Sequence, residues 1–228
     1  MNKRVLVSLI LMIVSLTIFT IFAVIIYKSL NEPTTLDVTI RDLFYNTRGN
    51  KYGFVFWFFR IITECGDLYF LIVFAILVIL YCRFDYRTFI IGGVMILAVL
   101  LNYVLKHTFN RERPIEEYRW MVDETSSFPS GHSSIICAAG LITGYFVWRL
   151  DIKGCIKYSI IGGISLLVIL VIISRLVLGM HYFTDVVAGA SLGVLCASAG
   201  IMVSYFFEKY NILQKPLFNY KKKEEKTE

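Results

Sequence analysis

The sequence predicts an all-α protein, a single domain built as a polytopic membrane bundle of six transmembrane helices. Hydrophobic residues make up 57% of the 228 residues and charged residues only 18%, with a mean hydropathy of +0.67. This balance is too apolar for a water-soluble domain of this size. The apolar residues also form long blocks, and about 20 of them suffice to cross the hydrocarbon layer of a bilayer.

Six apolar blocks are the expected membrane helices. They are Val5–Tyr27, Leu68–Cys82, Phe89–Leu105, Ser133–Trp148, Tyr158–Leu178 and Asp185–Phe207. The first block is longer than the apolar part of a secretion signal, which has about 7–15 residues, and no small-residue cleavage site follows it. We therefore expect an uncleaved first helix. The aromatic segment Gly53–Ile62 is expected either to lie in the membrane interface or to begin the second helix.

Basic residues predict the orientation of these helices. They gather before the first block, after the second, after the fourth and beyond the sixth, at Lys3, Arg4, Arg83, Arg87, Arg149, Lys153, Lys157 and in the tail of about 208–228. Cytoplasmic loops of membrane proteins carry such an excess. We therefore expect a multi-pass cell-membrane protein with both termini, including the short tail, in the cytoplasm.

Other classes of protein are disfavoured. The net charge of +6 follows the pattern of membrane topology, so no nucleic-acid partner is expected. The five cysteines lie in or beside apolar blocks without a C-x-x-C pair, which argues against a zinc site or a disulfide framework. Two G-x-x-x-G pairs, Gly140/Gly144 and Gly189/Gly193, are interpreted as helix contacts.

Unusual polar residues gather where this topology places the outer face. Lys106 precedes "HTFNRERP", "SFPSGHSS" opens the fourth block, and "SRLVLGMHYFTD" joins the fifth to the sixth. Ionisable groups at membrane depth are costly and indicate function. His107 and Arg111, which lie beside the first of these segments, are interpreted as interface residues.

The first two segments predict an anion site. Pro129 and Ser130 suit the start of a helix, and Gly131 lets the backbone approach a ligand. Free N–H groups at a helix start bind anions. Lys106, Arg113 and Arg175 can converge there, and the planar fork of an arginine fits phosphate oxygens. Two or three cations with a helix start indicate a phosphoryl group.

The third segment predicts a nucleophile. His181 and Asp185 are four residues apart, so they share one face of a helix and would be near each other in a turn. A carboxylate bonded to one ring nitrogen leaves the other free to attack, and imidazole can act as a covalent nucleophile. His132 is then the general acid. Since no carboxylate cluster offers a magnesium site, we expect hydrolysis without a metal or another cofactor.

Together these segments resemble a known signature. The pattern Lys106-x6-Arg113-Pro114, Pro129-Ser130-Gly131-His132 and Ser174-Arg175-x5-His181-x3-Asp185 is similar to the three-part signature of the type 2 phosphatidic acid phosphatase superfamily. The resemblance implies a phosphohistidine at His181, oriented by Asp185, with His132 protonating the leaving group. It also implies that Lys106, Arg113, Ser130, Gly131 and Arg175 hold the phosphate.

The resemblance implies a metal-independent membrane phosphatase acting on a lipid phosphate or pyrophosphate at the outer face. Undecaprenyl pyrophosphate, phosphatidylglycerophosphate and phosphatidate are substrates of small members, and the motif does not choose among them. Residues 114–128 and Asn31–Ile62 are hypothesised to set selectivity. The sequence leaves the oligomeric state open.

Two alternatives have different chemistry. A non-catalytic lipid-phosphate-binding or transport protein could retain the pocket, although binding alone would not need His132, His181 and Asp185 together. A vanadate-dependent haloperoxidase has a similar pocket, but such enzymes are soluble, and six apolar blocks argue against this class.

Overall fold

The computed structural model describes residues 2–29, 32–82 and 84–213. Within these ranges the chain forms α-helices, one short 3-10 helix at Glu116–Tyr118, and no strand, which confirms the all-α prediction. The helices are α1 (Lys3–Ser29), α2 (Thr35–Thr47), α3 (Phe54–Glu64), α4 (Leu68–Cys82), α5 (Tyr86–Phe109), α6 (Gly131–Trp148), α7 (Gly154–Val177) and α8 (Phe183–Lys209).

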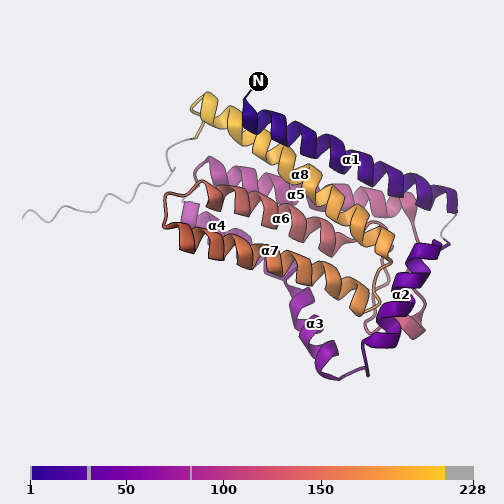
Figure 1. Cartoon of the computed structure of the whole chain (residues 1–228). Coiled ribbons are helices and arrows are strands. Elements are labelled where there is room, and N and C mark those ends of the chain that lie inside the picture. The colour runs from indigo at the N-terminus through magenta and orange to yellow at the C-terminus, as the bar shows by residue number, and fades with distance from the viewer. Residues whose placement is uncertain (1, 30–31, 83, 214–228) are drawn as a thin grey trace, which may run out of the picture.

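The long helices α1 and α5–α8 run side by side, and α8 packs against α1, α5 and α6 (Figure 1). The start of α1 lies beside the end of α8, where Arg4 and Glu208 form an ion pair of 2.8 Å. The short helices α2 and α3 lie at the other end of the bundle, against α7 and α8. The two ends of the bundle are therefore built differently.

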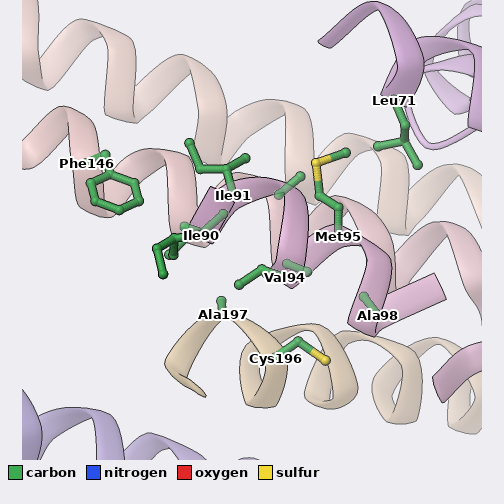
Figure 2. Close-up of a cluster of buried hydrophobic side chains, with 12 residues drawn as sticks. Leu71, Ile90, Ile91, Val94, Met95, Ala98, Phe146, Cys196 and Ala197 are labelled. Atoms are coloured by element: carbon green, nitrogen blue, oxygen red, sulfur yellow. The ribbon is translucent and has the colours of Figure 1, made fainter. Parts of the chain in front are cut away.

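Small residues set the close packing at the centre of the bundle. The core joins α4, α5, α6 and α8 through side chains such as Leu71, Val94 and Cys196 (Figure 2). A Cβ at Gly189 or Gly193 would collide with backbone atoms of α6 or of its cap, which confirms the predicted helix contact there.

The other predicted small-residue contact is only half present. Gly140 packs against Val168 of α7, whereas no atom of the described part of the chain lies within 4 Å of a Cβ built at Gly144. The cysteines are free thiols; Cys82, Cys137 and Cys196 are buried, as expected of small apolar core residues, whereas Cys155 is exposed.

All six predicted apolar blocks are helical, but fewer helices meet the criteria of a membrane span. By length and composition, α1, α5, α7 and α8 can each cross a membrane. The pair α3 and Tyr69–Cys82, bent by 47°, can form a fifth span. Because α6 opens with polar residues and packs among α5, α7 and α8, it needs less lipid-facing apolar surface. The described chain thus holds four to five candidate spans, and six remains a prediction.

The segment before α4 contains two helices of its own. Gly53–Ile62 is mostly α3, which is separate from α4 rather than its first turn. Helix α2 was not predicted, although Thr34 and Asp37 form a capping box at its start, a pattern that can be read from sequence. Of the tail at about 208–228, residues 214–228 lie outside the described residues.

Candidate active site

The polar residues selected from the sequence come together at the end of the bundle that carries α2 and α3. Each stands at a helix end or in a connecting segment: Lys106 in the last turn of α5, Arg113 after α5, Ser130 to His132 at the start of α6, Arg175 in the last turn of α7, His181 between α7 and α8, and Asp185 in the first turn of α8.

The start of α6 is built as the sequence predicts. Ser130 is the N-cap, and its Oγ accepts hydrogen bonds from the backbone N–H of Ser133 at 3.5 Å and from its hydroxyl at 3.0 Å. The Ser130 N–H donates to the carbonyl of Asp185 at 3.0 Å, and Gly189 lets α8 approach this cap closely. The start of α6 is therefore held against the first turns of α8.

A sharp helix end places His181. After α7, Gly179 adopts a left-handed backbone with φ of 69°, and its N–H donates to the carbonyl of Leu176. The N–H of Met180 donates to the carbonyl of Arg175 at 3.0 Å, which completes a Schellman ending. A side chain at position 179 would collide with the backbone of Tyr118. Glycine is thus required for the turn that brings His181 beside Arg175.

His181 and Asp185 lie close together, but the contact predicted between them is indirect. Their Nδ1 and Oδ2 atoms are 3.7 Å apart. Ser127 lies against both: its Oγ donates to Asp185 Oδ2 at 2.5 Å and is 3.4 Å from His181 Nδ1. Because the Ser127 hydrogen points to the carboxylate, its oxygen accepts the Nδ1 proton and Nε2 stays unprotonated. Sequence reasoning missed Ser127.

Arg113 faces the free nitrogen of His181. Its Nη1 is 3.3 Å from His181 Nε2 and donates to the carbonyl of Met180 at 2.8 Å. Its other nitrogens bind Thr125, and Asp123 forms an ion pair with it at 2.6 Å. The guanidinium therefore lies where a phosphoryl group attacked by Nε2 would need a cation.

The two remaining cations approach the same place from different helices. Lys106 Nζ donates to the hydroxyl of Thr125 at 3.2 Å and to the carbonyl of Ser126. Arg175 is only 2% exposed; its Nη1 donates to the hydroxyl of Thr63 on α3 at 2.7 Å, and its Nε has no hydrogen-bond partner among the described residues. An unpaired buried donor is costly, and a bound anion would relieve that cost.

His132 lies in the first turn of α6, against the α3–α4 break. A Cβ added at Gly66 would come within 2.8 Å of the His132 ring, so this turn covers one side of the imidazole.

The positive charges of the site also act on the imidazole of His181. Burial first, then the positive charges of Arg113, Arg175 and Lys106, lower its pKa well below the ordinary value of 6.5. Its imidazole is therefore neutral at neutral pH.

The interpretation of Arg111 as an interface residue was wrong. Its side chain is buried, with 1% of the residue exposed, and it forms ion pairs with Asp185 and with Asp37 of α2. Two carboxylates that need a counter-ion make burial of the guanidinium favourable, and sequence spacing did not reveal Asp37 as a partner. His107, by contrast, is exposed, and its Nδ1 is 2.8 Å from the carbonyl of Tyr103.

Residues 87–209 match the family model of the PAP2 superfamily, and the chain belongs to this family. That range covers every predicted site residue but neither α2 nor α3. Among the described residues, no three His, Cys, Asp or Glu side chains are grouped as a metal site would require.

Three comparisons extend the family assignment. Phosphatidylglycerophosphatase B of Bacillus subtilis (strain 168) is 39% identical over 118 residues, which are 49% of this chain and 57% of that protein. The crystal structure of a transmembrane PAP2-type phosphatidylglycerolphosphate phosphatase from Bacillus subtilis superposes with a TM-score of 0.69 and 26% identity, over 86% of this chain and 96% of the other.

The third comparison shows the fold alone. The crystal structure of Aquifex aeolicus LpxE superposes with a TM-score of 0.61 at 21% identity, over 75% of this chain and 97% of that one. Together, the family match and these structures identify the fold as that of membrane PAP2 phosphatases.

Proposed function

We propose that this protein is a membrane lipid phosphatase that hydrolyses a phosphomonoester or pyrophosphate of a lipid through a phosphohistidine at His181. The observation that carries the proposal is the geometry of the His181 ring. Its Nδ1 is tied through Ser127 to Asp185, and its Nε2 lies 3.3 Å from the guanidinium of Arg113. A neutral imidazole with a free nitrogen beside a phosphate-binding cation is an activated nucleophile.

The reaction has two displacements. In the first, Nε2 of His181 attacks phosphorus, the bond to the leaving oxygen breaks, and His132 donates a proton to that oxygen. In the second, His132 takes a proton from water, the water oxygen attacks phosphorus, and the P–N bond breaks to release phosphate and restore His181. The imidazole of His132 therefore serves first as the acid and then as the base.

The cations stabilise charge on the transferred phosphoryl group. Lys106, Arg113 and Arg175 neutralise its oxygens, and the backbone at Ser130 and Gly131 offers the start of α6. Three cations at one site supply the charge that a metal would otherwise supply, so we expect turnover to survive a chelator. Phosphate release unaffected by EDTA supports this point, and loss that added Mg²⁺ restores contradicts it.

We propose that the helices cross the bilayer six times, with α3–α4 as the second crossing and α6 as the fourth. Both termini then face the cytoplasm and the site faces outward. The pairing of Arg4 with Glu208 at the end of α8 remote from His181 supports this arrangement. A membrane-impermeant thiol reagent on intact cells should label Glu117→Cys and leave Cys155, which is exposed in the first turn of α7, unlabelled. Labelling of Cys155 alone would mean that the termini face outward and that the site faces the cytoplasm.

The substrate we propose to test first is phosphatidylglycerophosphate, because the Bacillus subtilis relative is a phosphatidylglycerophosphatase. A panel with undecaprenyl pyrophosphate, phosphatidate and lysophosphatidate, ranked by kcat/KM, measures the preference. Exchanging residues 114–128 with those of a member of different preference should change the ranking. An unchanged ranking would place selectivity elsewhere, with 31–62 the next segment to exchange.

His181→Ala tests the nucleophile. Turnover should disappear, and a phosphoenzyme trapped by acid quench in the parent should be absent. His107→Ala, which alters an exposed histidine outside the site, is the control and should keep both. Turnover that persists in His181→Ala would refute the proposed nucleophile. Tight binding of a lipid phosphate without any turnover by the parent would favour the non-catalytic alternative.

A further inference from the structure

A buried guanidinium connects the catalytic carboxylate to a helix that the sequence motifs do not include. Arg111 Nη1 donates to Asp185 Oδ1 and to the hydroxyl of Thr184 at 2.8 Å. Its Nη2 donates to Asp37 Oδ2 at 2.9 Å. The side chains of Arg111, Asp37 and Asp185 are all 0% exposed. Two carboxylates and one guanidinium therefore form a chain shielded from water.

Both carboxylates have every oxygen engaged. Asp37 Oδ1 accepts the backbone N–H of Thr184 at 2.9 Å, and its Oδ2 accepts from Thr34 and from the Thr184 hydroxyl. Asp185 Oδ2 accepts the backbone N–H of Tyr182 at 2.9 Å and the Ser127 hydroxyl. Arg111 therefore holds Oδ1 of Asp185, while Oδ2 is left to act through Ser127 on His181.

We propose that Arg111 and Asp37 are positioning residues for the catalytic pair. Arg111 fixes the orientation of the Asp185 carboxylate, and Asp37 balances the Arg111 charge so that Asp185 keeps its full negative potential toward His181. This inference rests on the proposed nucleophile. It also makes α2, which lies outside residues 87–209, part of the catalytic apparatus.

The charge balance explains why both residues are needed. The chain of three charges is an anion overall, and the imidazole becomes positively charged when Nε2 binds phosphorus. An anion near Nδ1 stabilises that state. Asp37→Asn leaves the chain neutral. Arg111→Gln leaves two buried carboxylates without a counter-ion, so one of them takes up a proton and the hydrogen bonds that orient Asp185 are disturbed. The double variant again holds a single anion, Asp185, still bonded by Ser127.

The test is a double-mutant cycle with Asp37→Asn, Arg111→Gln and the pair. We expect kcat to fall about tenfold in the first and about a hundredfold in the second, the range known for residues that orient catalytic ligands. KM should stay within about threefold, since neither side chain reaches the phosphate. The double variant should be more active than Arg111→Gln alone, because its net charge is restored.

Arg41→Gln is the matched control. Arg41 lies one turn after Asp37 on α2, but its guanidinium pairs with Asp42 and lies over the ring of Tyr118. This variant removes an arginine charge from α2 and keeps the bonds among Asp37, Arg111 and Asp185, so kcat should stay near that of the parent. Losses that simply multiply across the cycle, or an equal loss in Arg41→Gln, would overturn the positioning role.

A spectroscopic measurement separates this proposal from the proposed function. With ¹⁵N-labelled histidine, only three residues give signals, and His181 is assigned by its loss in His181→Gln. The parent and the double variant should show the Nδ1–H tautomer, and Arg111→Gln a mixture. The tautomer result is expected even if His181→Ala keeps turnover, because persistent turnover would refute His181 as the nucleophile but not the positioning of its ring. An unchanged tautomer in folded Arg111→Gln refutes the positioning. If Arg111→Gln does not accumulate in cells, Arg111→Lys replaces it in both the kinetic and the spectroscopic measurement, because a lysine cannot bridge both carboxylates. The same outcomes then support or refute the positioning role.

Discussion

The two ends of α8 carry similar charged groups in opposite surroundings. At its C-terminal end Glu208 pairs with Arg4 and Arg149, whose side chains are 38% and 34% exposed. At its N-terminal end Asp185 and Asp37 pair with Arg111, and all three are fully buried. Water and salt screen the first cluster, so its pairs stabilise little. The second is shielded, so each of its charges depends on the others.

The two clusters contain the same kinds of charged side chain, so the difference in what they contribute comes from their exposure to water. Four measurements test this difference between the two ends of α8.

Asp185→Asn should have the largest effect. The amide keeps the shape of the side chain but removes the charge that stabilises the imidazole, as in other carboxylate–histidine pairs, and kcat should fall about 10³- to 10⁴-fold. Phosphate release from a detergent-solubilised lipid phosphate measures the change, with retained helical circular dichroism as the control. A fall of less than about tenfold would mean that the carboxylate is dispensable.

Arg111→Gln should have the largest effect on stability. It leaves two buried carboxylates without their counter-ion, and removing one partner of a buried ion pair lowers the free energy of unfolding by about 3–5 kcal/mol. Denaturant unfolding in mixed detergent micelles gives the free energy of unfolding. Asp37→Asn/Arg111→Gln should recover part of the loss, and a variant as stable as the parent would show that water reaches this cluster.

His181 should make the stability of the protein depend on pH. Its pKa in the folded chain lies below the ordinary value of 6.5, so between these two pKa values the unfolded chain binds a proton and the folded chain does not. Stability should therefore fall as pH drops below about 6.5 and be unaffected by this residue above it. The fall in Tm from pH 7 to pH 5 should be smaller in His181→Gln than in the parent; an equal fall would assign it to other groups.

Glu208→Gln should have the smallest effect. Partly exposed ion pairs contribute at most about 1 kcal/mol, and the site lies at the other end of α8, so kcat should not change. The parent's stability should also decrease slightly with added salt, and that dependence should weaken in the variant. A loss as large as that of Arg111→Gln would erase the contrast between the two ends.

Much of the fold could be predicted from the sequence because apolar runs report directly on membrane helices. Each of the six blocks lies largely within a helix, with ends shifted by a few residues. The break between α3 and α4 was harder to predict. An aromatic run such as Gly53–Ile62 suits an interfacial helix and the start of a span equally well, and the sequence does not reveal the 47° bend between α3 and α4.

The candidate site was predictable where it follows short-range patterns and not where it depends on long-range contacts. Ser130 caps a helix, and His181 and Asp185 lie four residues apart, so sequence spacing reveals both. Asp37 and Arg111 meet across 74 residues of chain, and Ser127 reaches His181 across 54. No local spacing reveals such partners.

The amino-acid sequence alone was enough to predict an all-α membrane protein of this family with cationic side chains around His181. Composition and short motifs carry that information because helix formation and membrane partition depend on neighbouring residues. The folded structure was needed to show that Arg111 is buried, that Ser127 lies between His181 and Asp185, and that α2 contacts Asp185 through Arg111. The physical reason is that a buried charge takes its partner from whatever the packed helices bring within hydrogen-bond distance, and that choice exists only in the folded chain.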